Sequence, residues 1–234
     1  MIVSLEGIQG SGKSTTASVL CFIDWRYHNM KIITNNHMNF PYTHFDPQYF
    51  LAHLNDEEMN NCDLFLDEGY LYLDSRTSAS KLNKLFTYFI AQCRKRGVNL
   101  FVCTHHVDIL DKRLRRAVDV RGTCRTVKEE PCRLCQGTGE GTPSKGVCGD
   151  CRGTGENFLD GEPCAKCGGE KKGTSCPRCF GYGVSSTTRV SFFNRRDLTR
   201  SRMVIHGPMY YHLFDTEEKI PFTKKQMRIS AEDL

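Results

Sequence analysis

The sequence predicts an α/β fold with a mostly parallel central sheet and a small zinc-stabilised insertion near its C-terminal end. Three observations support this prediction. Short apolar runs alternate with segments of helical periodicity, which is typical of a parallel sheet covered by helices. A glycine-rich loop joins the first apolar run to the first helical segment. Eight of the thirteen cysteines fall in four CxxC pairs between Cys132 and Cys179.

Apolar runs and the residues that flank them define the elements in order. Asp46 and Pro47 have the N-cap and first-turn chemistry of a short helix. The run Cys62–Leu66 is followed by acidic residues, which suits a buried parallel strand. Apolar residues at helical spacing predict a longer helix that Gly97 ends. The predicted strands are residues 2–6, 31–34, 62–66, 99–104, 118–127, 185–194 and 202–206, and the predicted helices are residues 13–26, 46–54 and 78–96.

The composition changes at about Pro131. From there to Gly183 the chain is rich in Gly, Cys, Thr and charge and poor in large apolar residues. Such a segment cannot build an ordinary core, so bound metal must supply its stability. The simplest topology is a hairpin of strands whose tip has been replaced by this segment. We therefore predict a core in two parts, residues 1–130 and 184–234, and a cysteine-rich insertion at residues 131–183.

The glycine-rich loop fits the phosphate-binding pattern GxxxxGK[ST] from Gly7 to Ser14. Its glycines allow backbone N–H groups to turn inward around a phosphate, and the dipole of the following helix points at the same group. Lys13 is expected to reach the β- and γ-phosphates of ATP, and the Ser14 hydroxyl to ligate Mg²⁺. The predicted nucleotide-binding residues of the loop are Gly7, Gly10, Ser11, Gly12, Lys13, Ser14 and Thr15.

Asp67 and Glu68 follow the third predicted strand and complete this site. Asp67 is expected to hold Mg²⁺ through water, and Glu68 to polarise the attacking water. A glutamate in this place favours hydrolysis over phosphoryl transfer to a substrate. A bare Asp-Glu pair after a strand can also be a solvated strand end, but its position downstream of a phosphate-binding loop favours the catalytic interpretation.

Composition restricts the remaining possibilities. The formal net charge of +5 permits a polyanionic partner without requiring one. No stretch approaches eighteen apolar residues and no secretory leader is recognised, so we expect a cytoplasmic protein without membrane insertion. In a reducing compartment, tight CxxC pairs indicate metal ligands rather than disulfides. The five other cysteines are expected to be small buried hydrophobes, namely Cys21, Cys62, Cys93, Cys103 and Cys124.

Three further segments carry a family resemblance: residues 67–76, residues 92–99, and residues 104–106 with the following 111–115. Together with the phosphate-binding loop they resemble the HerA/FtsK class of ring-forming DNA translocases. The likeness is greatest to the virus and phage branch, which includes genome-packaging and zonula-occludens-toxin-like ATPases. Tyr211–Thr216 is similar to the Tyr-Asp-Thr ending of that branch, with Phe214 in place of the tyrosine.

This resemblance implies a RecA-like (ASCE) P-loop NTPase fold and an ATP-driven motor that moves or packages double-stranded viral or mobile-element DNA as a homo-oligomeric ring. It also implies a host-cytoplasmic or virion-associated location. His105 stands where the family usually has a glutamine that contacts the γ-phosphate. The likeness suggests Arg113 and Arg115, with Arg76 as a further candidate, as arginine fingers that act on a neighbouring subunit. A solvated or DNA-facing basic helix at 112–116 and an ordinary strand end at His105 remain alternatives.

The CxxC pairs form four repeats, three of which fit CxxCxGxG in full, whereas the third has Lys171 in place of the last glycine. This spacing predicts two tetrahedral four-cysteine zinc sites. The pattern resembles the cysteine-rich domain of DnaJ-type chaperones, which implies that repeat one pairs with four and repeat two with three. The implied sites are Cys132, Cys135, Cys176 and Cys179, and Cys148, Cys151, Cys164 and Cys167.

Charge argues against DNA binding by the insertion. Residues 131–183 hold seven Lys and Arg against six Asp and Glu, and loading eight thiolates with two zinc ions makes the segment acidic. We expect a structural cap, or an arm that docks a capsid or membrane-associated protein, and we expect the basic surface on the ATPase body.

Two other functions are compatible with parts of the sequence. A nucleoside kinase of the thymidine-kinase type also joins a phosphate-binding loop to a cysteine zinc site, but it uses four cysteines and a different nucleoside-binding loop. A zinc-based adaptor with a vestigial nucleotide site is disfavoured because Lys13, Ser14, Asp67 and Glu68 are all intact.

Overall fold

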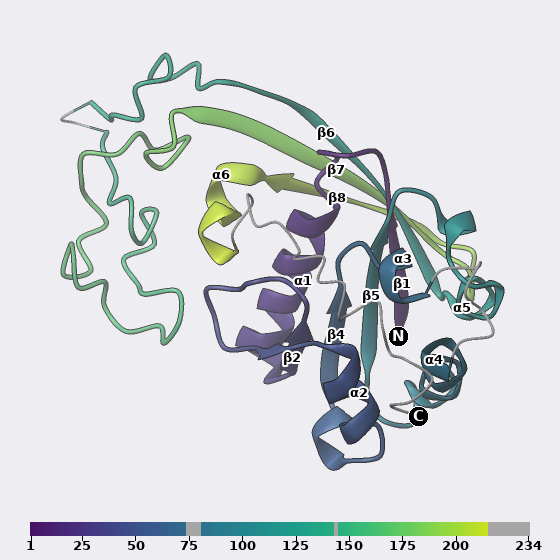
Figure 1. Cartoon of the computed structure of the whole chain (residues 1–234). Helices are drawn as coiled ribbons and strands as arrows, with labels where there is room; N and C mark the ends of the chain where they lie inside the picture. The colour runs from purple at the N-terminus through teal and green to yellow at the C-terminus, as the bar shows by residue number, and fades with distance from the viewer. Residues whose placement is uncertain (74–80, 143–144, 215–234) are drawn as a thin grey trace.

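The computed structural model describes residues 1–73, 81–142 and 145–214, which build an eight-stranded sheet in the order β3-β2-β4-β5-β1-β6-β7-β8 (Figure 1). The strands are β1 Ile2–Glu6, β2 Lys31–Thr34, β3 Thr43–His44, β4 Cys62–Leu66, β5 Asn99–Thr104, β6 Val120–Pro131, β7 Val184–Asn194 and β8 Arg200–His206. The helices are α1 Lys13–His28, α2 Pro47–His53, η1 Glu57–Met59, α3 Tyr70–Leu73, α4 Lys81–Gln92, η3 Val107–Ile109, α5 Lys112–Ala117, α6 Gly207–Tyr210 and η4 Tyr211–Leu213.

The sheet is mostly parallel, which confirms the predicted fold class. All neighbours from β3 to β6 pair in parallel, and only β7 and β8 run antiparallel to their neighbours. Strand β5 lies between β1 and β4. The carboxyl ends of parallel strands meet at one edge of a sheet, so the loop after β1, the acidic residues after β4 and the histidine after β5 all reach the same place.

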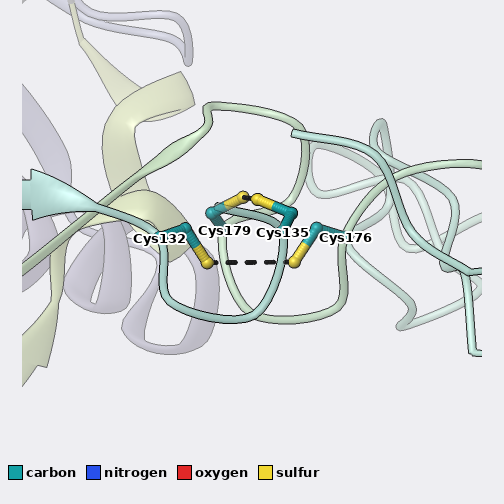
Figure 2. Close-up of side chains that lie close together, drawn as sticks. All are labelled: Cys132, Cys135, Cys176 and Cys179. Atoms are coloured by element: carbon teal, nitrogen blue, oxygen red, sulfur yellow. Dashed lines mark hydrogen bonds between the residues drawn. The ribbon is translucent and has the colours of Figure 1, made fainter. Parts of the chain in front are cut away.

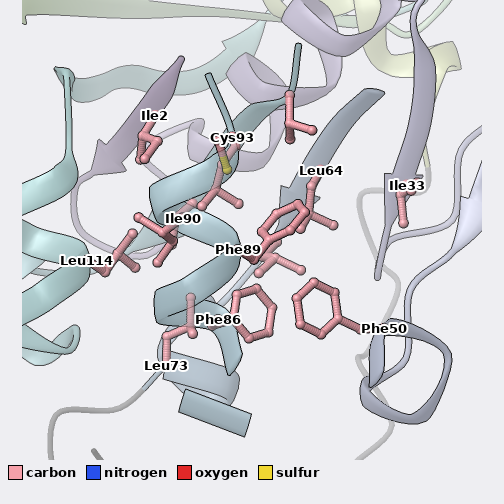
Figure 3. Packing of buried hydrophobic residues seen from close by; sticks show 14 of the residues in the cluster. Ile2, Ile33, Phe50, Leu64, Leu73, Phe86, Phe89, Ile90, Cys93 and Leu114 are labelled. Atoms are coloured by element: carbon pink, nitrogen blue, oxygen red, sulfur yellow. The ribbon is translucent and has the colours of Figure 1, made fainter. Parts of the chain in front are cut away.

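Apolar side chains pack on both faces of the sheet. On one face, α4 contributes Phe86, Phe89 and Ile90, and the Phe50 ring of α2 stacks on Phe86 with ring centroids 4.1 Å apart (Figure 3). On the other face, α1 packs against β1, β4 and β5 through a second apolar cluster that includes Leu5. The five isolated cysteines are all buried, as predicted, and burial raises the thiol pKa of each.

Several predicted boundaries differ from those of the structure. Helix α4 ends at Gln92 rather than Arg96, because the next residues form turns that Gly97 closes with a φ of +66°. The short strand β3 was not predicted, since two residues carry too little pattern. The start of the predicted helix at 78–80, Arg76 and the Asp215–Thr216 pair lie outside the described residues.

Strands β6 and β7 form the long antiparallel hairpin that the sequence predicted, and they lead into the cysteine-rich segment at Pro131 and Val184. This segment folds back onto the body (Figure 1). The Phe158 ring lies 6.3 Å from Phe22 of α1 and 4.6 Å from His212, centroid to centroid. Sequence patterns did not predict these contacts. Within the described residues, no helix combines the length and the apolarity that crossing a membrane requires.

Candidate nucleotide site and cysteine clusters

The loop after β1 has the conformation that a phosphate cradle needs. Gly7, Gly10 and Gly12 adopt φ values of +154°, +71° and +84°, which L side chains rarely tolerate. A Cβ added at Gly12 would lie 2.3 Å from the Thr188 hydroxyl and 2.8 Å from that of Thr126. Helix α1 begins directly after the loop. Its unpaired N–H groups and positive dipole end therefore face the loop, where an anion is stabilised.

Lys13 is folded into this loop. Its ammonium donates to the Gly7 carbonyl at 3.0 Å and to the Ile8 carbonyl at 3.1 Å, and its side chain is 6% exposed. Among the described residues, this buried ammonium has neutral carbonyl partners and no acidic one, and an anionic phosphate in the loop would supply the missing charge partner.

Ser14 and Asp67 lie in direct contact although 53 residues separate them. The Ser14 hydroxyl donates to Asp67 Oδ2 at 2.7 Å. Two asparagines after β2 fix the aspartate: Asn36 Nδ2 donates to the same oxygen at 3.1 Å, and Asn35 exchanges two hydrogen bonds with the Asp67 backbone. The Ser14 hydroxyl at the start of α1 and the Asp67 carboxylate at the end of β4 match the oxygen donor set that Mg²⁺ prefers.

Sequence reasoning missed these two asparagines. The signal was present, because an Asn-Asn pair stands directly after the buried strand β2, at the carboxyl edge where β4 also ends. Both side chains are buried, and their amides orient the carboxylate that the sequence did identify.

Glu68 has a strained backbone and one carboxylate oxygen without a hydrogen-bond partner among the described residues. Its φ of +49° lies in the left-handed region, which costs free energy for a residue with a side chain. Its Oε2 is buried and has no hydrogen-bond partner among the described residues. The other oxygen lies 3.8 Å from His105 Nε2 at the end of β5. The structure thus places His105 beside the candidate base, in the same cluster as Asp67.

The two described candidate arginine fingers lie away from this cluster within one chain. The Arg113 guanidinium donates two hydrogen bonds, of 3.0 and 3.1 Å, to the buried Asp111 carboxylate. Arg113 also lines a cavity together with Met1, which precedes β1 at the amino edge of the sheet. Arg115 pairs with the exposed Asp108 at 2.9 Å. Both arginines thus pair with acidic residues of their own chain.

The cysteines gather into two sets of four, in the grouping that the chaperone resemblance implied. In the outer set, the sulfurs of Cys132 and Cys176 lie 3.9 Å apart and those of Cys135 and Cys179 lie 3.6 Å apart (Figure 2). The corresponding distances in the inner set are 3.9 and 3.7 Å, and all sulfurs of a set lie within 4.8 Å. Tetrahedral zinc with bonds of about 2.3 Å requires sulfurs about 3.8 Å apart, so both sets fit this ion.

All four repeats share one backbone conformation. The residue after the second cysteine has a φ near +50° in each repeat, and glycine follows it at a larger positive φ. Lys171 replaces glycine in the third repeat and still adopts a φ of +68°. In two repeats the glycine at that position donates its N–H to a sulfur, from Gly139 to Cys135 and from Gly155 to Cys151. Such donors stabilise thiolates.

Hydrogen bonds around the outer set also suit metal binding. Burial opposes ionisation of Cys135, but hydrogen bonds from backbone N–H groups outweigh it and hold the pKa at about 6. Burial raises the pKa of the neighbouring Cys179 to about 12. The backbone donors around Cys135 thus favour its thiolate, which is the form of cysteine that binds zinc.

The comparisons with known proteins concern the fold. No family model matches the chain, and no curated protein matches its sequence. The N-terminal domain of zonular occludens toxin from Neisseria meningitidis superposes with a TM-score of 0.51 at 13% identity, over 92% of this chain and 98% of that chain. The genome packaging NTPase B204 from Sulfolobus turreted icosahedral virus 2 matches with a TM-score of 0.48 at 15% identity, over 86% and 95% of the two chains.

The fold is that of a P-loop NTPase. The sheet order, the loop after β1 and the paired Ser14 and Asp67 agree with this description. At these sequence identities the likeness shows the architecture alone.

Proposed function

We propose that this chain hydrolyses ATP and uses the energy to move along nucleic acid. The observation that carries the proposal is the cluster at the carboxyl edge of the sheet, where the Ser14 hydroxyl and Asp67 meet beside Lys13 and the unsatisfied Glu68. These residues come from two segments far apart in the sequence, namely the start of α1 and the end of β4.

Each residue has a distinct part in the proposed reaction. The loop N–H groups and Lys13 hold the β- and γ-phosphates, with Gly7, Gly10, Ser11, Gly12 and Thr15 forming the cradle. Ser14 and Asp67 would hold Mg²⁺, which neutralises charge on the phosphates when bound. Glu68 accepts the proton of the attacking water, and His105 donates to the γ-phosphate or orients the glutamate.

The candidate base Glu68 favours a hydrolase over a nucleoside kinase. Glu68 Oε2 is buried and has no hydrogen-bond partner among the described residues, as expected of a group that orients water. The chain also has two complete four-cysteine sets rather than one. Double-stranded DNA is the proposed substrate because the translocase-like segments and the basic body support it.

We further propose a homo-oligomeric ring in which an arginine reaches the neighbouring subunit's nucleotide. Arg115 suits this part better than Arg113, because its partner Asp108 is 85% exposed and is exchanged at little cost, whereas Asp111 is 7% exposed and caps α5. The insertion at 131–183, with two Zn²⁺, is proposed as a structural cap that also docks a capsid or membrane-associated protein in the host cytoplasm or the virion.

Steady-state ATP hydrolysis tests the proposed function. The wild-type protein should hydrolyse ATP, and linear double-stranded DNA should raise the rate severalfold. Lys13→Ala should abolish ATP binding, because the backbone cradle alone does not neutralise the γ-phosphate. Specific activity should also rise with protein concentration as rings assemble. Full activity of a monomer at nanomolar dilution would contradict the trans arginine, and phosphorylation of thymidine would favour the kinase alternative.

A further inference from the structure

In the described part of the chain, strands β6, β7 and β8 have one face on which most side chains are exposed. Val120, Cys124, Val190, Met203 and Ile205 point to the α1 side and join the core there. Side chains alternate along a strand, so the intervening residues point to the opposite side. We name this opposite side the arginine face. It consists of Arg121, Thr123 and Arg125 of β6, Arg189, Ser191 and Phe193 of β7, and Arg200, Arg202 and Val204 of β8.

Register brings these side chains into three rows across the sheet. Arg121, Phe193 and Arg200 form the first row, Thr123, Ser191 and Arg202 the second, and Arg125, Arg189 and Val204 the third. The face thus carries five arginines, and the segments 121–125, 189–193 and 200–204 contain no acidic residue.

In the part of the chain that the structure describes, these cations are not neutralised. Arg125, Arg189, Arg200 and Arg202 are exposed, and none of the four has an ion-pair partner among the described residues. Arg125 stands directly opposite Arg189, an arrangement of like charges that destabilises an antiparallel pair. Arg200 lies over the Phe193 ring at 5.9 Å, which fixes its plane while its N–H groups stay available. A cost of this kind is offset by an anionic partner.

We propose that the arginine face binds the phosphate backbone of double-stranded nucleic acid. This inference rests on the proposed motor function and names the surface that holds its substrate. Guanidinium groups match phosphate oxygens bidentately. The face is about 10 Å wide and about 13 Å long, and none of its described residues forms an element that enters a groove, so its contacts are with phosphates and not with base edges. Sequence-independent binding of this kind is what movement along any sequence requires.

The face also lies one sheet thickness from the nucleotide loop. Thr126 and Thr188, which follow Arg125 and precede Arg189 in the chain, point to the other side and contact Gly12 from there. A phosphate held by these arginines would therefore contact strand segments that pack against the nucleotide loop. A shift of these segments on DNA binding would reach the nucleotide through direct contacts.

Salt-dependent DNA binding tests the assignment. Anisotropy of a labelled duplex of random sequence is measured without nucleotide at about 50 to 200 mM salt, where the slope of log K against log salt counts neutralised phosphates at about 0.9 each. Two double variants are compared with the wild type, Arg125→Gln with Arg189→Gln and Arg200→Gln with Arg202→Gln. Each should reduce the magnitude of the slope by about 1.8, because two phosphate contacts are lost. Arg133→Gln with Lys145→Gln removes the same charge from exposed positions of the insertion and should leave the slope unchanged.

The outcomes separate this inference from the proposed function. If the wild-type protein binds the duplex and both arginine pairs retain its slope, with melting temperatures unchanged, the face does not hold DNA although the motor function stands. Loss of self-association at unchanged DNA affinity would instead assign the face to an acidic surface of a neighbouring subunit. Duplex binding through the face by a protein that does not hydrolyse ATP would support the inference and overturn the proposed motor.

Discussion

Replacing Glu68 by glutamine is expected to leave ATP binding intact and to lower turnover by about 100- to 10,000-fold. The amide has nearly the same shape as the carboxylate but cannot accept a proton, and general-base catalysis contributes a factor of this size. Glu68 Oε2 is buried and unsatisfied among the described residues, so the substitution breaks no hydrogen bond of that oxygen. Nucleotide binding by calorimetry and turnover by phosphate release measure the two effects separately.

The matched control is Glu57→Gln, because Glu57 is an exposed glutamate on η1, outside the nucleotide cluster. It should hydrolyse ATP at the wild-type rate. Normal turnover by the Glu68→Gln protein would show that another group positions the water.

Removing zinc is expected to unfold the insertion while the core still binds nucleotide. Structural zinc contributes about 10 to 16 kcal/mol to small cysteine domains at pH 7, and the insertion has little apolar core besides its sulfurs. The body has its own two apolar clusters around the sheet and needs no metal. Metal analysis should find two zinc ions per chain, and chelation should raise hydrogen exchange at 131–183 while nucleotide affinity persists.

Paired cysteine substitutions test the grouping of the ligands. Cys132 and Cys176 belong to one set, so the protein carrying both Cys132→Ser and Cys176→Ser should keep one zinc ion. Cys132 and Cys148 belong to different sets, so replacing those two should remove both ions. If the first variant instead loses both ions and the second keeps one, adjacent repeats pair. A single zinc ion in the wild-type protein, or immediate loss of ATP binding on chelation, would also contradict the assignment.

Local chemistry explains which features the sequence predicted. The phosphate-binding loop and the CxxC repeats are contiguous in the chain, and their residue types are dictated by backbone conformation and by ligand geometry. Buried parallel strands can also be recognised in the sequence as apolar runs. Lys171 shows the limit of such rules, since it adopts the left-handed conformation of the glycine that it replaces.

Features that depend on distant pairing were not predictable in the same way. Asn35 contacts Asp67 because β2 and β4 pair side by side, and the sequence alone does not show this pairing. The docking of Phe158 on Phe22 joins segments 136 residues apart and has no pattern of its own. The arginine face depends on strand register, because a slip of one residue would turn every arginine toward the core.

Displacement of a triplex-forming strand from duplex DNA tests the central claim most directly, because only a protein that moves along the duplex removes the third strand. The wild-type protein with ATP and Mg²⁺ should release the strand at a rate that follows ATP turnover, and Glu68→Gln should bind the same DNA without releasing it. Displacement by the wild-type protein without ATP, or none despite DNA-stimulated hydrolysis, would contradict a nucleic-acid motor.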